Sequence, residues 1–200
     1  MGKNTKKIIG AFLVMLVAAV LVLGGFYMLN NKGISSSGES TSLPSSEIGK
    51  LKAKDLELKY PETPSEVVKL YWRLNKCMYN TSMNEKDFEA LLKQLRLLYD
   101  EEFLASGENS WDNMLKNFQK DKKSFNKNKR VISSYTVEDE REVKYATLDK
   151  RECATLLTST LETVKSKNTQ FITKFMCRRD DSGKWKILGW EKAEGEDLKK

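Results

Sequence analysis

The hydrophobic residues of this chain fall into three successive patterns, each typical of a different structure. Near the N-terminus, residues 8–29 form an uncharged run of 22 positions. As a helix, this run is roughly 33 Å long, which is enough to cross a hydrocarbon core of about 30 Å. After residue 60 the apolar residues recur at helical spacing, and from residue 130 they lie in short segments rich in β-branched and aromatic residues. The sequence therefore predicts one transmembrane helix followed by an α+β domain.

Three helices are predicted in the first half of this domain from their N-terminal caps. Thr63 is followed by a proline and then by Glu66, which together form a capping box. Asn84 and Ser110 start the second and third helices, and Gly107 is expected to end the second. The apolar stripe of the third helix comprises Trp111, Met114, Leu115, Phe118 and Phe125.

Five β-strands are predicted in the second half, at residues 131–137, 143–148, 153–164, 169–179 and 184–191. The sequence Asp180-Asp181-Ser182-Gly183 is typical of a turn, so the last two strands are expected to form a hairpin. Helices first and antiparallel strands second indicate an α+β fold, with three helices packed on one face of a curved sheet of four to five strands.

Charge around the apolar run predicts the orientation of the chain in the membrane. Lys3, Lys6 and Lys7 precede the run with no acidic residue, so the N-terminus is expected in the cytoplasm and the domain outside the cell membrane. Residues 50–60 are expected to form a short lead-in helix or an extended arm. The predicted organisation is 1–7 cytoplasmic, 8–29 transmembrane, 30–50 a linker rich in Ser and Gly, 51–195 the extracytoplasmic domain, and 196–200 a charged tail.

A cleaved signal peptide is the alternative to a retained anchor. The apolar core of a signal peptide is usually about 7–15 residues long, shorter than this run. No small-x-small cleavage site closes the run either, because Val22 and Leu23 stand two places before Gly24 and Gly25. The sequence therefore favours a retained anchor.

Composition limits the classes of function. The formal charge is +7, but three of the 35 basic residues lie in the cytoplasmic N-terminus, so 32 oppose 28 acidic residues outside, too small an excess to indicate nucleic-acid binding. Histidine is absent, which removes His-based catalysis and makes a catalytic zinc site improbable. Cys77, Cys153 and Cys177 lack metal-ligand spacing and are interpreted as buried hydrophobes, with one disulfide plus a spare thiol as the alternative. No enzyme activity, metal or cofactor is predicted.

The third helix carries a row of lysines opposite its apolar stripe. Lys116, Lys120, Lys123 and Lys127 lie about 170–190° from the centre of the stripe at 100° per residue. These four residues, called the lysine ridge below, form either an ordinary solvated face or a surface for anionic headgroups, wall polymers or an acidic partner. The acidic cluster at residues 138–142 is interpreted as a solvated loop.

Aromatic residues on the predicted strands are candidates for a pocket. Trp185 and Ile187 are expected on one face of the last strand, with Leu188 and Trp190 on the other. A curved sheet closed by helices can enclose a cavity, although such residues also serve as plain core. The predicted cavity-lining residues are Tyr135, Phe171, Phe175 and Trp185.

The chain also resembles known proteins. Its final hairpin, with Gly183-Lys184-Trp185-Lys186-Ile187, is similar to the closing hairpin of nuclear-transport-factor-2-like domains, a cone-shaped α+β fold. Most of the chain resembles an uncharacterised family of membrane-anchored proteins from clostridial bacteria. The residues that carry this second resemblance are Tyr60-Pro61 with Pro64, Glu66-Val67-Val68-Lys69, Lys76-Cys77-Met78-Tyr79-Asn80, Leu98-Tyr99-Asp100, Ile132-Ser133-Ser134-Tyr135, Trp185-Lys186-Ile187 and Gly189-Trp190.

These resemblances imply an architecture and a cellular setting, and no catalytic residue. Cavity enzymes of the wider superfamily typically use an Asp–His pair, which a chain without histidine cannot form. We therefore expect a non-enzymatic interaction module of the bacterial cell envelope, tethered to the membrane, with a protein partner or an anionic polymer. The alternative is a domain that binds a small apolar or amphipathic ligand in its cone.

Overall fold

The predicted helix starts are confirmed in the computed structural model, which describes residues 45–194. The Thr63 hydroxyl accepts a hydrogen bond from the Glu66 amide at 3.2 Å, and Asn84 Oδ1 accepts one from the Asp87 amide at 2.8 Å. A serine cap of the same kind starts the third helix. These side chains satisfy amide groups that lack a partner in the first helical turn.

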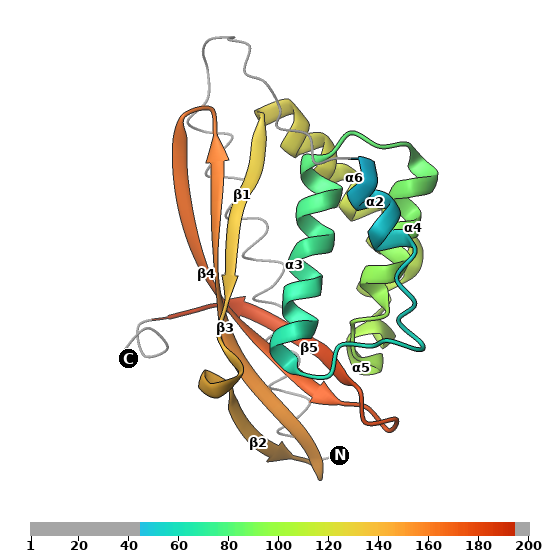
Figure 1. Cartoon of the computed structure of the whole chain (residues 1–200), viewed down its shortest axis with the longest axis vertical. Coiled ribbons are helices and arrows are strands. Elements are labelled where there is room, and N and C mark those ends of the chain that lie inside the picture. The colour runs from blue at the N-terminus through green and yellow to red at the C-terminus, as the bar shows by residue number, and fades with distance from the viewer. Residues whose placement is uncertain (1–44, 195–200) are drawn as a thin grey trace.

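The helices cover one face of an antiparallel sheet (Figure 1). In chain order they are α2 (Ser45–Lys52), α3 (Pro64–Asn80), α4 (Glu85–Arg96), α5 (Glu101–Ala105) and α6 (Trp111–Asn128). Two short 3-10 helices, η1 (Gly107–Asn109) and η2 (Glu140–Glu142), lie in the connections. The long helix α3 runs beside the sheet, and α2, α4 and α6 pack around it (Figure 1).

All five predicted strands are present. They are β1 (Arg130–Val137), β2 (Lys144–Leu148), β3 (Arg151–Val164), β4 (Lys167–Arg179) and β5 (Trp185–Lys192). The strand order is β1-β3-β4-β5, and β2 pairs with the first part of β3 while β1 pairs with its second part. Strand β3 therefore has β2 and β1 as successive neighbours along one edge and β4 along the other. Strand β5 pairs with the outer edge of β4.

A β-bulge in β5 corrects the predicted faces of the last strand. The register of β5 against β4 shifts so that Ile187 pairs with Cys177 but Trp190 pairs with Phe175, with one extra β5 residue between them. The extra residue reverses the alternation of side chains. Trp190 therefore lies on the same face as Trp185, facing the helices, and the prediction that it shares a face with Leu188 is wrong.

The core lies between α3 and α4 and the helix-facing side of the sheet. Its rings are closely packed: the Tyr71 and Phe175 centroids lie 5.2 Å apart, those of Tyr71 and Trp190 5.6 Å, and those of Phe175 and Trp190 5.9 Å. Cys77, Cys153 and Cys177 are free and buried, in agreement with the prediction of buried hydrophobes.

The segment after α4 forms an additional edge of the sheet. The Ile187 amide donates to the Leu98 carbonyl at 2.7 Å, and the Asp100 amide donates to the Ile187 carbonyl at 2.9 Å. Helix α4 therefore ends at Arg96, and the prediction that Gly107 ends it is wrong. The backbone leaves the helix because β5 offers it new hydrogen-bond partners.

The start of the domain also differs from the prediction. Residues 45–50, assigned to the linker, belong to α2, whose Leu51 is only 1% exposed and packs into the core. Trp111, predicted as core, is half-buried at the margin of the core. None of the helices between residues 45 and 194 combines the length and the hydrophobicity of a membrane-spanning helix. The predicted span at 8–29 lies outside the described residues.

Candidate functional site

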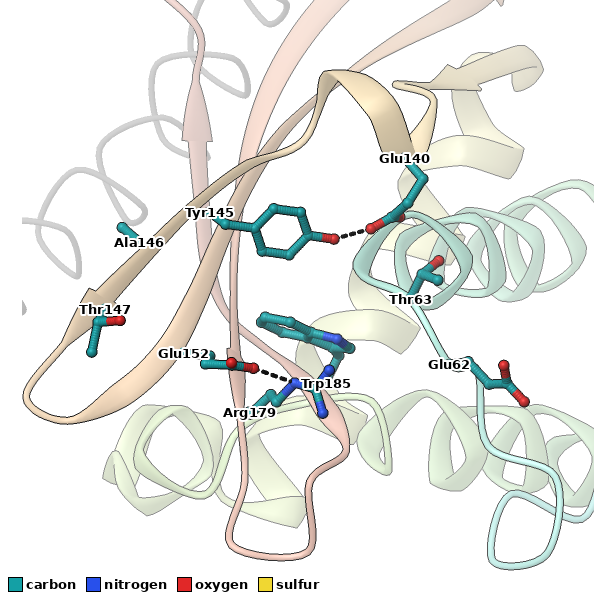
Figure 2. A pocket seen from close by; sticks show the side chains of 9 residues that line it. All are labelled: Glu62, Thr63, Glu140, Tyr145, Ala146, Thr147, Glu152, Arg179 and Trp185. Carbon is teal, nitrogen blue, oxygen red and sulfur yellow. Dashed lines mark hydrogen bonds and ion pairs between the residues drawn. The ribbon is translucent and has the colours of Figure 1, made fainter.

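A surface hollow forms where the sheet extends beyond the helix layer. Helix α3 begins after Thr63, but the helix-facing side of the sheet continues for one more row of side chains. In this row Thr147 pairs with Glu152, and Arg179 pairs with Trp185. Because no helix covers the row, it forms the floor of an open hollow of about 510 Å³. The lining residues are Glu62, Thr63, Glu140, Tyr145, Ala146, Thr147, Glu152, Arg179 and Trp185 (Figure 2).

Two aromatic side chains form the apolar wall of the hollow. Trp185 is only 3% exposed, whereas Tyr145, on β2, is 54% exposed. Their ring centroids lie 5.7 Å apart with an interplanar angle of 54°. The Arg179 guanidinium stacks on the Trp185 ring, with Cζ 4.9 Å from the centroid, while the Tyr145 ring lies on the other side of Trp185 (Figure 2). One side of the indole is thus already occupied by a cation.

Carboxylates supply most of the charge around the hollow. Glu152 accepts from Arg179 Nε at 2.7 Å, so this pair is internally neutralised. Glu140 accepts a hydrogen bond from the Tyr145 hydroxyl through Oε1 (Figure 2), and its Oε2 is buried without a partner among the described residues. Glu62 at the rim makes no ion pair with any residue that the structure describes. The hollow therefore carries a net negative charge.

Trp185 is held in place from outside the hollow by the loop before α3. The Tyr60 hydroxyl donates to the Trp185 carbonyl at 2.8 Å, and Lys186 Nζ lies 4.4 Å from the Tyr60 ring centroid. Burial raises the pKa of the Tyr60 hydroxyl well above its usual range, so this donor keeps its proton at neutral pH. The indole wall is a fixed surface.

The chemistry of the hollow suits recognition of another molecule. Two aromatic rings, several acceptor oxygens and one stacked guanidinium can hold a polar ligand. Within residues 45–194, no three His, Cys, Asp or Glu side chains gather as metal ligands would.

The four residues predicted to line a cavity all lie on the helix-facing side of the sheet, but at different positions along the strands. Tyr135 and Phe171 both pair with Thr160 on β3, at the far end from the hollow. Phe175 is buried in the middle, and Trp185 alone of the four lines the hollow.

Two buried polar atoms without hydrogen-bond partners lie near Tyr135, at the end of the sheet away from the hollow. The Tyr135 ring stacks on Trp72 of α3, with centroids 6.2 Å apart. Trp72 Nε1 and Thr160 Oγ1 are both buried without a hydrogen-bond partner among the described residues. Such orphaned polar groups are uncommon in folded proteins, and each one calls for an explanation.

The lysine ridge lies where the sequence places it on α6. Lys116, Lys120, Lys123 and Lys127 are all exposed, and the intervening Lys122 turns inward instead. Lys122 Nζ donates to the carbonyls at the end of α3, at 2.7 and 2.8 Å, and burial lowers its pKa to about 8. The ridge residues are separate from the hollow.

Sequence reasoning missed most residues of the hollow. Glu140 belongs to a cluster that the sequence assigns to a solvated loop, and Tyr145 was not distinguished from other strand residues. Their association depends on β2 folding back onto β3, which brings Tyr145 opposite Ala154 and beside Trp185. One feature of the sequence could have indicated the site: Glu152 and Arg179 carry opposite charges near the open end of the predicted β3–β4 hairpin, where they can pair across the strands.

Comparison with known proteins gives a family for the chain. The sequence model of a family described as "Domain of unknown function (DUF6715)" matches residues 1–190. No curated protein matches the chain.

Proposed function

Because the chain belongs to the DUF6715 family, whose function is unknown, we propose a function from its geometry: a non-enzymatic interaction module tethered to the outer side of a bacterial membrane. The tether is the predicted span at residues 8–29. We also propose that the fold is the nuclear-transport-factor-2-like cone. Long helices that pack against a curved antiparallel sheet, and the closing hairpin β4–β5, support this assignment.

The packed interior is the observation that carries the proposal. The rings of Tyr71, Phe175 and Trp190 lie in mutual contact between α3 and the sheet. A domain filled in this way acts through its surface, whereas a ligand carrier needs an internal void with converging polar groups. The hollow beside Trp185 is a surface feature that a partner can reach.

The arrangement of elements along the long axis agrees with a tethered role. The first residue of α2 and the C-terminal end of α6 lie toward one end of the molecule, and β2 lies at the other (Figure 1). A tether that joins at residue 45 therefore enters at the end opposite the hollow. The lysine ridge lies on α6, in the half of the molecule that receives the tether, where anionic headgroups would be close.

Photo-crosslinking in native host cells tests the proposal. A photoreactive amino acid at Thr147, in the hollow, is expected to give a discrete adduct with another protein, and the same residue at the exposed Asn117 of α6 is the matched control. An interaction module predicts an adduct of defined mass at Thr147 only. Equal, diffuse labelling at both positions would contradict it.

The second candidate is a domain that binds a small amphipathic ligand at the far end of the cone. The unpartnered Trp72 Nε1 and Thr160 Oγ1, beside Tyr135 and Phe171, favour it, because the polar group of a ligand would satisfy them. Native mass spectrometry of the purified full chain separates the two candidates. A small molecule that copurifies and is lost in Thr160→Val supports ligand binding, and its absence supports the interaction module.

A further inference from the structure

We propose that the hollow beside Trp185 receives the cationic side chain, lysine or arginine, of a partner protein. This inference rests on the proposed function and names the chemistry that its surface recognises. The charges, the aromatic wall and one unsatisfied carboxylate oxygen carry it.

The charges of the hollow complement a cation. Its lining has three carboxylates and one guanidinium, and that guanidinium is already paired with Glu152 at 2.7 Å. Glu62 and Glu140 then have no counter-ion among the described residues. A lysine or arginine from outside would pair with them at a partly desolvated surface, where charge-assisted hydrogen bonds are strong.

The aromatic wall also favours a cation. The positive side chain of Arg179 stacks on one side of Trp185, which shows that this indole accepts a cation in the folded protein. The Tyr145 ring lies on the other side, 5.7 Å away between centroids, and its outer surface is exposed. A cation beside Tyr145 would meet the negative face of the ring, as in other cation–π pairs.

Glu140 supplies the most specific argument. One of its oxygens accepts from Tyr145, and the other is buried with no partner among the described residues. A buried, unpaired carboxylate oxygen is costly, and a donor from a ligand would relieve that cost. Glu140 and Tyr145 are in direct contact, so a cation beside the Tyr145 ring would lie next to this carboxylate.

A carbohydrate is the competing ligand for a site with aromatic and carboxylate groups. Each sugar hydroxyl group both donates and accepts hydrogen bonds, so a sugar site needs free donors as well as free acceptors. The lining offers carboxylates without counter-ions, and its one guanidinium is engaged with both Glu152 and Trp185. The observations therefore favour a basic side chain.

Nuclear magnetic resonance of the full-length chain tests the inference. The protein is labelled with ¹⁵N-tryptophan in non-ionic detergent, and the indole signal of Trp185, assigned with Trp185→Phe, is followed during titration. The probes are the N-acetyl methylamides of lysine and arginine, with norleucine as the uncharged control of similar chain length. The signal of Trp111, which lies outside the hollow, reports that each variant is folded.

We expect a saturable shift of the Trp185 signal with the lysine and arginine probes, weakened by salt. Norleucine should bind at least about tenfold more weakly, and Glu140→Gln and Tyr145→Ala should each weaken lysine binding by about tenfold. Leu148→Ala is the matched control, because Leu148 lies on β2 with 52% exposure but does not line the hollow. It should leave binding unchanged.

Three results would overturn the inference: norleucine binding as well as lysine, an oligosaccharide of N-acetylglucosamine shifting the signal in place of the cations, or Glu140→Gln without effect. The proposed function is tested separately. A protein adduct from Thr147 in cells, together with no effect of the lysine and arginine probes, would keep the interaction module and reject the cationic ligand.

Discussion

At the scale of single residues, the buried ion pair of Arg178 with Asp100 ties the segment after α4 to the sheet. Arg178 donates from Nε to Asp100 Oδ2 at 3.1 Å and from a guanidinium nitrogen to Glu102 at 2.9 Å. Asp100 is 1% exposed, and its side chain also accepts the Glu102 amide at 2.9 Å. The aspartate therefore both caps α5 and anchors it to β4.

Arg178→Ala is predicted to be among the most destabilising single changes. It leaves the Asp100 carboxylate buried without its counter-ion, and breaking such a pair costs about 3–5 kcal/mol. Urea titration of the purified protein measures the free energy of unfolding. Arg141→Ala, which removes an exposed pair with Asp139, is the control and should change stability little. Equal effects of the two variants would show that the Arg178 pair does not anchor α5.

Buried tyrosines make the domain sensitive to alkali. Burial raises the pKa of Tyr71, Tyr79 and Tyr99 well above the usual range, and the pKa of the Cys177 thiol is raised for the same reason. Above about pH 10 these tyrosines ionise in the unfolded chain but stay protonated in the folded one, so the unfolded state is favoured.

The free energy of unfolding is therefore predicted to fall as the pH rises above about 10. Urea titrations between pH 8 and pH 11 measure this fall. Tyr99→Phe removes one of the buried hydroxyl groups and should make the slope shallower. A stability that is constant up to pH 11 would mean that these hydroxyl groups are accessible to water.

At the scale of elements, α2 is part of the domain rather than of a linker. Its Ile48 and Leu51 are buried, and it packs mainly against α4. Arg73 of α3 adds an ion pair with Glu47, through Nε at 2.6 Å. The folded domain therefore begins before residue 60, because side chains of α2 form part of its core.

A fragment of residues 45–194 is predicted to fold, and a fragment that begins at residue 60 is predicted to be clearly less stable. The shorter fragment exposes the core positions that Leu51 covers. Leu51→Ala in the longer fragment should cost about 2–5 kcal/mol, as for other buried leucines. Circular dichroism during thermal unfolding measures both effects. Equal melting temperatures for the two fragments would place α2 outside the folding unit.

The lysine ridge on α6 gives a prediction about binding rather than stability. If it meets anionic headgroups, the 45–194 fragment should associate with vesicles that contain anionic lipid, and salt should weaken the association. Changing Lys116, Lys120, Lys123 and Lys127 to Gln should abolish association with little change in melting temperature, because all four are exposed. Cosedimentation measures binding. No binding at low salt would leave the ridge as a solvated face.

Local signals predicted the elements well, and contacts between distant segments explain the failures. Caps at Thr63 and Asn84 and the strand segments are short-range patterns, and the structure follows them. The faces of β5 were mispredicted because a bulge depends on the register with β4. Likewise, α4 ends early because residues 98–100 bond to β5, and no local pattern encodes that partner.

The candidate site was predicted only through Trp185. Its other members come from the start of α3, from η2 and from strands β2, β3 and β4, so only the folded sheet brings them together. The sequence shows the charge and type of each residue, but it does not show that the helix layer ends beside Trp185. The hollow forms because the helices stop there and the sheet continues.

For the whole molecule, the two ends of the long axis differ in character. Helix α2 begins toward one end of the long axis, and β2, whose residues line part of the hollow, lies at the other end (Figure 1). In the proposed arrangement, the tether would join the domain at the α2 end. A partner held at the hollow would then lie away from the bilayer, and the lysine ridge would lie nearer to it. The proposed function also includes a domain outside the cell and a retained N-terminal span.

Protease treatment of intact protoplasts, combined with N-terminal sequencing, tests the proposed topology. We expect added protease to remove the domain, because the proposed topology exposes it on the outer side. We expect the purified protein to begin at Met1 or Gly2, because residues 8–29 are proposed to remain as the anchor. A domain protected until the protoplasts are lysed, or a mature chain that begins between Gly25 and Gly38, would contradict it.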